Sequence, residues 1–164
     1  MTFERVAIIG LGLLGGSIGL AVHEHLPGIR TTGYDRDPAT RLRAAERGLT
    51  DEVCDSAAEA VREADLVIFC VPPGAMGEAA AEIADVLPAG ALVSDVGSSK
   101  QAIAKALGEA LPNHTVIPAH PVAGTENSGP DAGFASLFHN RWCIVTPPEP
   151  TKMCIRDSSR RLWP

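Results

Sequence analysis

Long apolar runs are scarce in this chain of 164 residues. The main candidate, residues 6–22, has 17 uncharged positions, and five of them are glycine. A membrane-spanning helix needs about 20 predominantly apolar residues, and glycine is a poor helix former. The pairs Gly12/Gly16 and Gly15/Gly19 do have the G-x-x-x-G spacing of membrane helices. Length and glycine content favour another role for this stretch, and we expect no association with a membrane.

Basic clusters and metal-ligand spacings are also lacking. Lys and Arg number 14 against 20 Asp and Glu, which gives a net charge of −6, and no basic cluster precedes the extreme C-terminus. A nucleic-acid partner is therefore not expected. Cys54, Cys70, Cys143 and Cys154 do not have the spacing of metal ligands. We expect no metal site, and reduced, buried thiols in a cytoplasmic protein.

Aromatic residues make up only 4% of the chain, and alanine, valine, glycine and leucine dominate instead. This composition is typical of helices packed closely on a sheet. Expected strands lie at 5–9, 30–34, 66–71, 91–94, 115–118 and 142–146, and expected helices at 14–25, 40–47, 56–63, 75–87 and 99–111. Alternating strands and helices predict an α/β fold with a doubly wound parallel sheet, formed by residues 1–150.

A glycine-rich turn joins the first expected strand to the first helix. Gly10, Gly12 and Gly15 match G-x-G-x-x-G, in which the first glycine allows the turn, the second lets a pyrophosphate approach, and the third lets helix and strand pack closely. Free amides at the helix start, at Leu13 and Leu14, would then face the phosphates. The pattern predicts a Rossmann-type dinucleotide-binding domain, although such a turn can also serve packing alone.

An acidic residue follows the second expected strand at the distance that this motif requires. Asp35 lies 20 positions after Gly15, where a carboxylate accepts hydrogen bonds from a ribose 2′-hydroxyl and repels a 2′-phosphate. The neighbouring Arg36 could stack on adenine or weaken that preference. Asp35 could also cap the next helix together with Asp37, which does not exclude a cofactor role. We therefore expect NAD as the cofactor, with NADP less favoured.

Polar residues lie beyond two later strands, at the sheet edge where ligands bind in such folds. His120 is held by Pro121 and followed by a loop of small residues, which is unlike a core position, and histidine suits proton abstraction near neutrality. Ser98 or Ser99 could cap the following helix or point into the cleft. From composition alone, Thr125 and Glu126 close the turn after the histidine.

Three stretches together resemble the prephenate/arogenate dehydrogenase family of tyrosine biosynthesis: residues 10–17 (GLGLLGGS), 95–100 (DVGSSK) and 120–129 (HPVAGTENSG). The resemblance covers residues 5–147. It implies that NAD takes a hydride from C4 of prephenate or arogenate while the ring carboxylate leaves as carbon dioxide, giving 4-hydroxyphenylpyruvate or tyrosine.

The resemblance also implies residue roles. His120 would take the proton of the C4 hydroxyl, and Ser98 would hydrogen-bond the same region and orient the histidine. Thr125 and Glu126 would line the substrate mouth. Val71 and Pro72, after the third long strand, would pass beside the ribose and nicotinamide of the cofactor.

The chain departs from this family after Pro150. Family members continue into a helical domain that dimerises and supplies substrate-binding residues, whereas residues 153–158 resemble translated adaptor sequence. We expect 1–150 to be the NAD-binding catalytic domain, 151–164 to be a non-native or flexible tail, and the full-length protein to form a homodimer through the missing domain.

Two other functions share the glycine motif. A β-hydroxyacid dehydrogenase or imine-reducing enzyme would not need His120 together with Thr125 and Glu126. A non-catalytic NAD-sensing module would bind the dinucleotide without a histidine near the nicotinamide.

Overall fold

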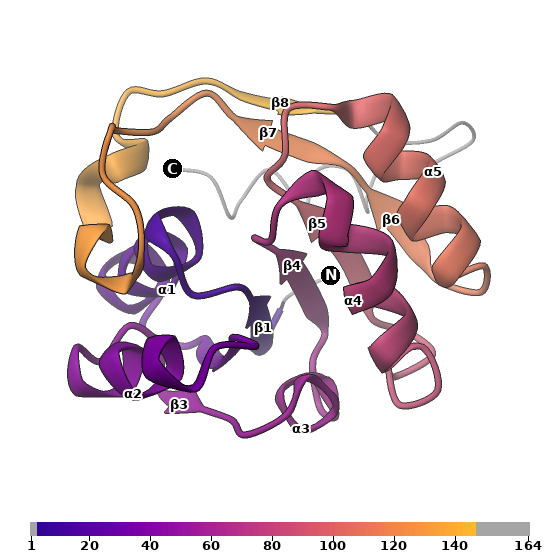
Figure 1. Cartoon of the computed structure of the whole chain (residues 1–164), viewed down its shortest axis with the longest axis horizontal. Helices are drawn as coiled ribbons and strands as arrows, with labels where there is room; N and C mark the ends of the chain where they lie inside the picture. Colours follow the sequence, from indigo (N-terminus) through magenta and orange to yellow (C-terminus); the bar gives the residue numbers. More distant parts are fainter. Residues whose placement is uncertain (1–2, 147–164) are drawn as a thin grey trace.

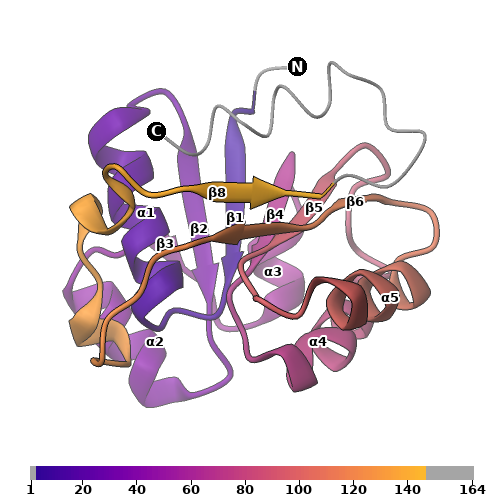
Figure 2. The same cartoon turned by 90° about the horizontal axis from the view of Figure 1, so that it is seen from above.

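A six-stranded parallel sheet forms the centre of the computed structural model, which describes residues 3–146. Its strand order is β3-β2-β1-β4-β5-β6 (Figures 1 and 2), so the order reverses beside the central β1 and confirms the predicted doubly wound sheet. The strands are β1 (Arg5–Ile9), β2 (Arg30–Tyr34), β3 (Glu52–Val53), β4 (Leu66–Phe69), β5 (Leu92–Asp95) and β6 (Thr115–Ile117). The two-residue β3 was not expected from the sequence.

Neighbouring residues of each strand point to opposite faces of the sheet. Because the side chains on both faces are apolar, each face is covered by helices. Ala7 and Ile9 of β1 belong to one hydrophobic core with α3, α4 and α5, and α4 packs beside α5 (Figure 1). Val6 and Ile8 belong to the other core, with α1, α2 and the short 3₁₀ helix η3. The helices are α1 (Leu13–His25), α2 (Pro38–Glu46), α3 (Ala57–Val61), α4 (Met76–Ile83), α5 (Lys100–Ala110) and η3 (Ala135–Phe138).

The glycines with membrane-type spacing serve helix packing in this fold. A Cβ on Gly16 would lie 2.9 Å from Leu49 Cδ1, and one on Gly19 would lie 1.9 Å from the Leu49 carbonyl oxygen. Small residues at these positions therefore let α1 approach the segment before β3. Within residues 3–146, no helix is long and apolar enough to cross a membrane.

Among the expected elements that are shorter in the structure, two are bounded by proline at the edge where a ligand is expected. The strand expected at 66–71 ends at Phe69, because Pro72 and Pro73 cannot donate to a strand ladder. The helix expected at 75–87 is preceded by a 3₁₀ turn over Pro73–Ala75 and covers only Met76–Ile83. Val71 and Pro72 are thereby released from the sheet at the edge where a ligand is expected.

The segment after β6 forms a second, two-stranded sheet that the sequence did not predict. Pro118 has no N–H and ends β6, and β7 (Ala119–Pro121) then pairs with the antiparallel β8 (Cys143–Val145). The β7–β8 pair runs crosswise to the strands of the large sheet (Figure 2). His120 thus lies in the middle of a short strand, opposite Ile144, and not beyond the end of β6 as expected.

Candidate functional site

In the turn between β1 and α1, neighbouring segments of backbone approach one another very closely. Gly10 has φ +100°, and a Cβ there would lie 2.7 Å from the Cys70 carbonyl oxygen. A Cβ on Gly15 would lie 1.9 Å from the Gly10 carbonyl oxygen, so α1 rests directly on the turn. A Cβ on Gly12 would meet nothing within 4 Å. The first and third glycines have the predicted structural roles, while Gly12 leaves open space in front of the helix.

A pocket of ≈ 390 Å³ opens in front of this turn, at the ends of β1, β2 and β4. Asp35 is half-buried there, and its carboxylate accepts hydrogen bonds from the Leu11 amide (2.9 Å) and the Asp37 amide (3.0 Å). The pocket is lined by Ile9, Gly10, Gly12, Tyr34, Asp35, Arg36, Cys70, Val71, Pro72, Ala75, Glu78, Ala79 and Glu82. The structure therefore brings six of the nine predicted cofactor residues into one cavity.

The other three, Leu13, Leu14 and Gly15, form the first residues of α1 and do not line this pocket. Gly12 is the N-cap residue of α1, and no side chain caps the helix. The amides of Leu13 and Leu14 thus start a helix without a side-chain acceptor, which leaves them available to an anion. Their contact with a cofactor stays a prediction.

Charged residues that sequence reasoning missed line the same pocket. Glu78 and Glu82 are on one face of α4, so the lining contains three carboxylates and one guanidinium, Arg36. Arg41 donates to the Asp35 carbonyl oxygen (2.9 Å), and its Cζ lies 5.6 Å from the Tyr34 ring centroid. The spacing of α4 beyond Pro72 could have indicated the two glutamates, because residues four apart share a helix face.

Asp37 caps α2, as the sequence predicted. Its carboxylate accepts from the Ala39 amide (3.1 Å), the Thr40 amide (3.2 Å) and the Thr40 hydroxyl (2.8 Å). These hydrogen bonds, that of the Thr40 hydroxyl first, lower the pKa of Asp37. The capping role therefore falls to Asp37, and Asp35 faces the pocket.

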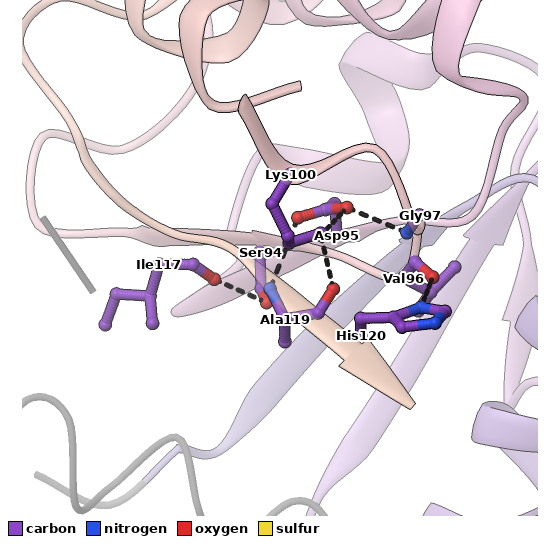
Figure 3. A network of polar contacts seen from close by, with 8 residues as sticks. All are labelled: Ser94, Asp95, Val96, Gly97, Lys100, Ile117, Ala119 and His120. Carbon is purple, nitrogen blue, oxygen red and sulfur yellow. Dashed lines mark hydrogen bonds and ion pairs between the residues drawn. The ribbon is translucent and has the colours of Figure 1, made fainter. Parts of the chain in front are cut away.

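His120 is half-buried, and its orientation is fixed by one backbone group (Figure 3). Its Nδ1 lies 3.1 Å from the Val96 carbonyl oxygen, which can only accept a hydrogen bond. Nδ1 must therefore carry the proton, and in the neutral ring Nε2 is an acceptor. Val96 follows β5, which neighbours β4 in the sheet, so the histidine is one strand away from the strand that borders the pocket.

An ion pair between Asp95 and Lys100 is bonded to Ala119, the residue before His120 (Figure 3). The fully buried Asp95 accepts from the Gly97 amide (2.8 Å), from the Ala119 amide (3.3 Å) and from the Lys100 ammonium. Lys100 Nζ also donates to the Ala119 carbonyl oxygen. Burial lowers the pKa of Lys100, and pairing with Asp95 opposes that shift.

The remaining predicted site residues do not line the Asp35 pocket. Ser98 is exposed, and the group bonded to His120 Nδ1 is the Val96 carbonyl. Ser99 is the N-cap residue of α5, without a side-chain capping bond. Thr125 and Glu126 are exposed and line a separate hollow of ≈ 660 Å³.

The segment that follows Thr125 and Glu126 is anchored on α1 and α2. The Phe134 amide donates to the buried Ser17 hydroxyl of α1 (3.0 Å), and Arg43 Nε of α2 lies 2.7 Å from Asp131 Oδ1. The structure thus separates these two residues from the Asp35 pocket, and their predicted role at a substrate mouth is untested.

Thiols near the site are not activated. Burial raises the pKa of Cys70, which lines the pocket, and it raises that of Cys143, opposite Pro121, to about 11. Among the described residues, no group of three or more His, Cys, Asp or Glu side chains is placed to hold a metal ion. The expected tail at 151–164 lies outside the described residues.

Comparison with known proteins finds a matching family and similar dehydrogenase sequences. Residues 18–163 match the family described as prephenate dehydrogenase, nucleotide-binding domain. The chain is 48% identical over 145 residues to cyclohexadienyl dehydrogenase of Zymomonas mobilis, covering 88% of this chain and 50% of that protein. It is 34% identical over 153 residues to prephenate dehydrogenase of Bacillus subtilis, covering 90% of this chain and 40% of that protein. The chain therefore spans half or less of the length of these curated relatives.

Solved structures agree with this assignment. Prephenate dehydrogenase from A. aeolicus, in complex with hydroxyphenyl propionate and NAD⁺, superposes with a TM-score of 0.86 at 25% identity, covering 99% of this chain and 57% of that one. An imine reductase from Pseudomonas, at 13% identity and a TM-score of 0.69, shares the fold alone. The family match covers most of the chain, and the sheet order agrees with it: the chain belongs to the prephenate dehydrogenase family and contains its nucleotide-binding domain.

Proposed function

We propose that this chain binds NAD and supplies the base for oxidative decarboxylation of prephenate or arogenate. The observation that carries the proposal is His120, whose Nδ1 bond to the Val96 carbonyl leaves Nε2 of the neutral ring as a hydrogen-bond acceptor. A module that only senses NAD would need no such group. Membership in the prephenate dehydrogenase family supports the same reaction.

The pocket fits a dinucleotide with a free 2′-hydroxyl. Open space in front of Gly12 leaves room for a pyrophosphate at the uncapped start of α1. Asp35 is already held by two amides and retains acceptor capacity for a ribose hydroxyl. Asp35, Glu78 and Glu82 together would repel a 2′-phosphate, which supports NAD over NADP. The A. aeolicus relative was solved with NAD⁺.

The residues of this chain account for the proton chemistry. NAD, when bound, accepts the hydride that leaves C4. His120 Nε2 accepts the proton of the C4 hydroxyl, which becomes a carbonyl. The bond to the ring carboxylate then breaks, carbon dioxide leaves, and the electron pair makes the ring aromatic with a phenolate oxygen at C4. The imidazolium of His120 returns its proton to that oxygen, so the base is restored.

Substrate recognition is the less complete part of the site. We propose that Ser98 contacts the C4 region and that Thr125 and Glu126 contact the outer end of the substrate. Residues 120–129 contain no lysine or arginine, yet the substrate carries two carboxylates. We therefore propose that a cation from a further domain, like the one the family resemblance implies, completes the site and that the same domain forms a homodimer.

Two measurements test this function. Titration calorimetry of the chain with NAD and NADP is expected to show binding with a preference for NAD. The chain alone is expected to form no NADH from prephenate or arogenate. A fusion of residues 1–146 to the remaining half of the Zymomonas relative is expected to form it with at least one of the two substrates. A folded fusion that binds NAD but oxidises neither substrate would contradict the proposal.

A further inference from the structure

We propose that Asp95 and Lys100 are positioning residues that hold His120 in place and set which of its ring nitrogens is protonated. The inference rests on the proposed function only for the statement that His120 is the base. The contacts that carry it are independent of that role. They lie in the network drawn in Figure 3.

The first contact fixes the backbone that carries His120. Both polar groups of Ala119, the residue before the histidine, are bonded to the ion pair: its amide donates to Asp95 Oδ1 and its carbonyl accepts from Lys100 Nζ. Ala119 is 2% exposed. Water therefore has little access to replace either bond, and the Cα position of His120 depends on the pair.

The second contact fixes the ring of His120. Asp95 is followed by Val96, whose carbonyl is the acceptor for His120 Nδ1. The same Asp95 carboxylate accepts from the Gly97 amide (2.8 Å), which holds the backbone on the other side of Val96. Val96 is covalently joined to Asp95 on one side and to Gly97, whose amide donates to the Asp95 carboxylate, on the other. Asp95 therefore fixes the backbone on both sides of the carbonyl that selects the ring tautomer.

The placement of Lys100 has a cost, which indicates that its contacts serve a specific purpose. Lys100 is the first residue of α5, where a positive charge is unfavourable to the helix dipole. Its side chain is only 18% exposed, whereas that of Lys105 on the same helix is 76% exposed. Lys100 thus gives up solvation to reach Asp95 and Ala119. A buried cation at this position is explained if β5 and β7 must be held in one relative position.

The test is the ¹⁵N chemical shifts of the His120 ring in this chain, measured at a pH where the ring is neutral. The unmodified protein is expected to show a protonated Nδ1 and an unprotonated Nε2. In Lys100→Met the ring is expected to exchange between both tautomers, and the Ala119 amide to exchange with solvent at least tenfold faster. Lys105→Met is the matched control and is expected to leave both readings unchanged.

Two further variants are controls for a loss of folding in Lys100→Met. Lys100→Met leaves a buried carboxylate without its partner, which can unfold a protein. If it does, Asp95→Asn/Lys100→Met removes that charge and is expected to show the same ring exchange. Lys100→Arg retains donors for Asp95 and Ala119 and is expected to restore the single tautomer.

A folded Lys100→Met or double variant with the ring shifts of the parent would overturn the proposal. In the fusion enzyme, the same variants are expected to lower kcat roughly 10- to 100-fold, as for a small misplacement of a reacting group, with the KM for NAD unchanged. A fusion without any turnover would count against the proposed function alone, since the ring shifts are read in its absence.

Discussion

The two halves of the site, the glycine turn and the surroundings of His120, depend on different kinds of contact. Around Gly10, Gly12 and Gly15 the functional surface is backbone, and its shape depends on the absence of side chains. Around His120 it depends on a buried carboxylate and ammonium that join β5 to β7. The comparison teaches that the first half tolerates no added atoms at Gly10 and Gly15, while the second tolerates no lost hydrogen bonds. Substitutions in each half should therefore fail in different ways.

The largest expected effect is that of Gly15→Ala. The new methyl would lie 1.9 Å from the Gly10 carbonyl oxygen, so α1 must move away from the sheet. We expect a loss of about 4 kcal/mol or more in the free energy of unfolding, well above an ordinary substitution. Chemical denaturation measures it, and Gly12→Ala, with nothing within 4 Å of its methyl, is the control. Equal stability of the two variants would refute the packing argument.

The histidine half is tested by His120→Asn in the fusion enzyme. Removing the proton acceptor is expected to lower kcat by ~10²–10⁴, the usual contribution of a positioned base. NAD affinity should not change, because the pocket lining does not include this residue. His23→Asn, at a histidine side chain that is 78% exposed, should behave as the parent. A variant within threefold of the parent rate would remove His120 from the mechanism.

A smaller effect is expected for Gly12→Ala on cofactor binding. The methyl enters the open space before α1 without touching the protein, and there it would lengthen hydrogen bonds from the amides to the pyrophosphate. Loss of one charge-assisted bond is worth about 1.5–3 kcal/mol, so NAD affinity should fall roughly 10- to 100-fold. Calorimetry measures it, with denaturation to confirm unchanged stability. Unchanged affinity would place the phosphates elsewhere.

The smallest expected effect is that of Asp35→Ser on cofactor choice. Removing one negative charge near a 2′-phosphate relieves about 1 kcal/mol of repulsion at 4 Å in water, or roughly a fivefold change in the NAD to NADP affinity ratio. The ratio is the appropriate measure, since loss of the Leu11 amide contact affects both cofactors. An unmodified protein that binds both cofactors equally would show that Asp35 does not select between them.

Sequence reasoning recovered the backbone-built half and much of the fold. The bounds of β1 and β2, the cap at Asp37, and the grouping of Gly10, Asp35 and Pro72 at one edge follow from local signals. Each depends on residues close together in the chain, or on the rule that parallel strands end at one edge.

The histidine half could be predicted only in part. His120 was identified from its sequence context, but its acceptor Val96 is 24 residues away, and nothing local indicates that pairing. The separation of β7 from β6 depends on Pro118 and on a partner strand at Cys143–Val145. Lys100 is an ordinary first-turn residue in the sequence and becomes part of the site only through Asp95 and Ala119.

Because of the two hydrogen bonds that Asp35 accepts, the loops around the cofactor pocket become ordered when the protein folds, before any ligand binds. The carboxylate links the loop after β1, through the Leu11 amide, to the loop after β2, through the Asp37 amide. Fixing a backbone residue costs about 1–2 kcal/mol of conformational entropy. Here that loss is taken when the protein folds and not when a ligand arrives. The glycine turn therefore meets its dinucleotide already ordered, and binding there should proceed as a single kinetic step without a preceding rearrangement.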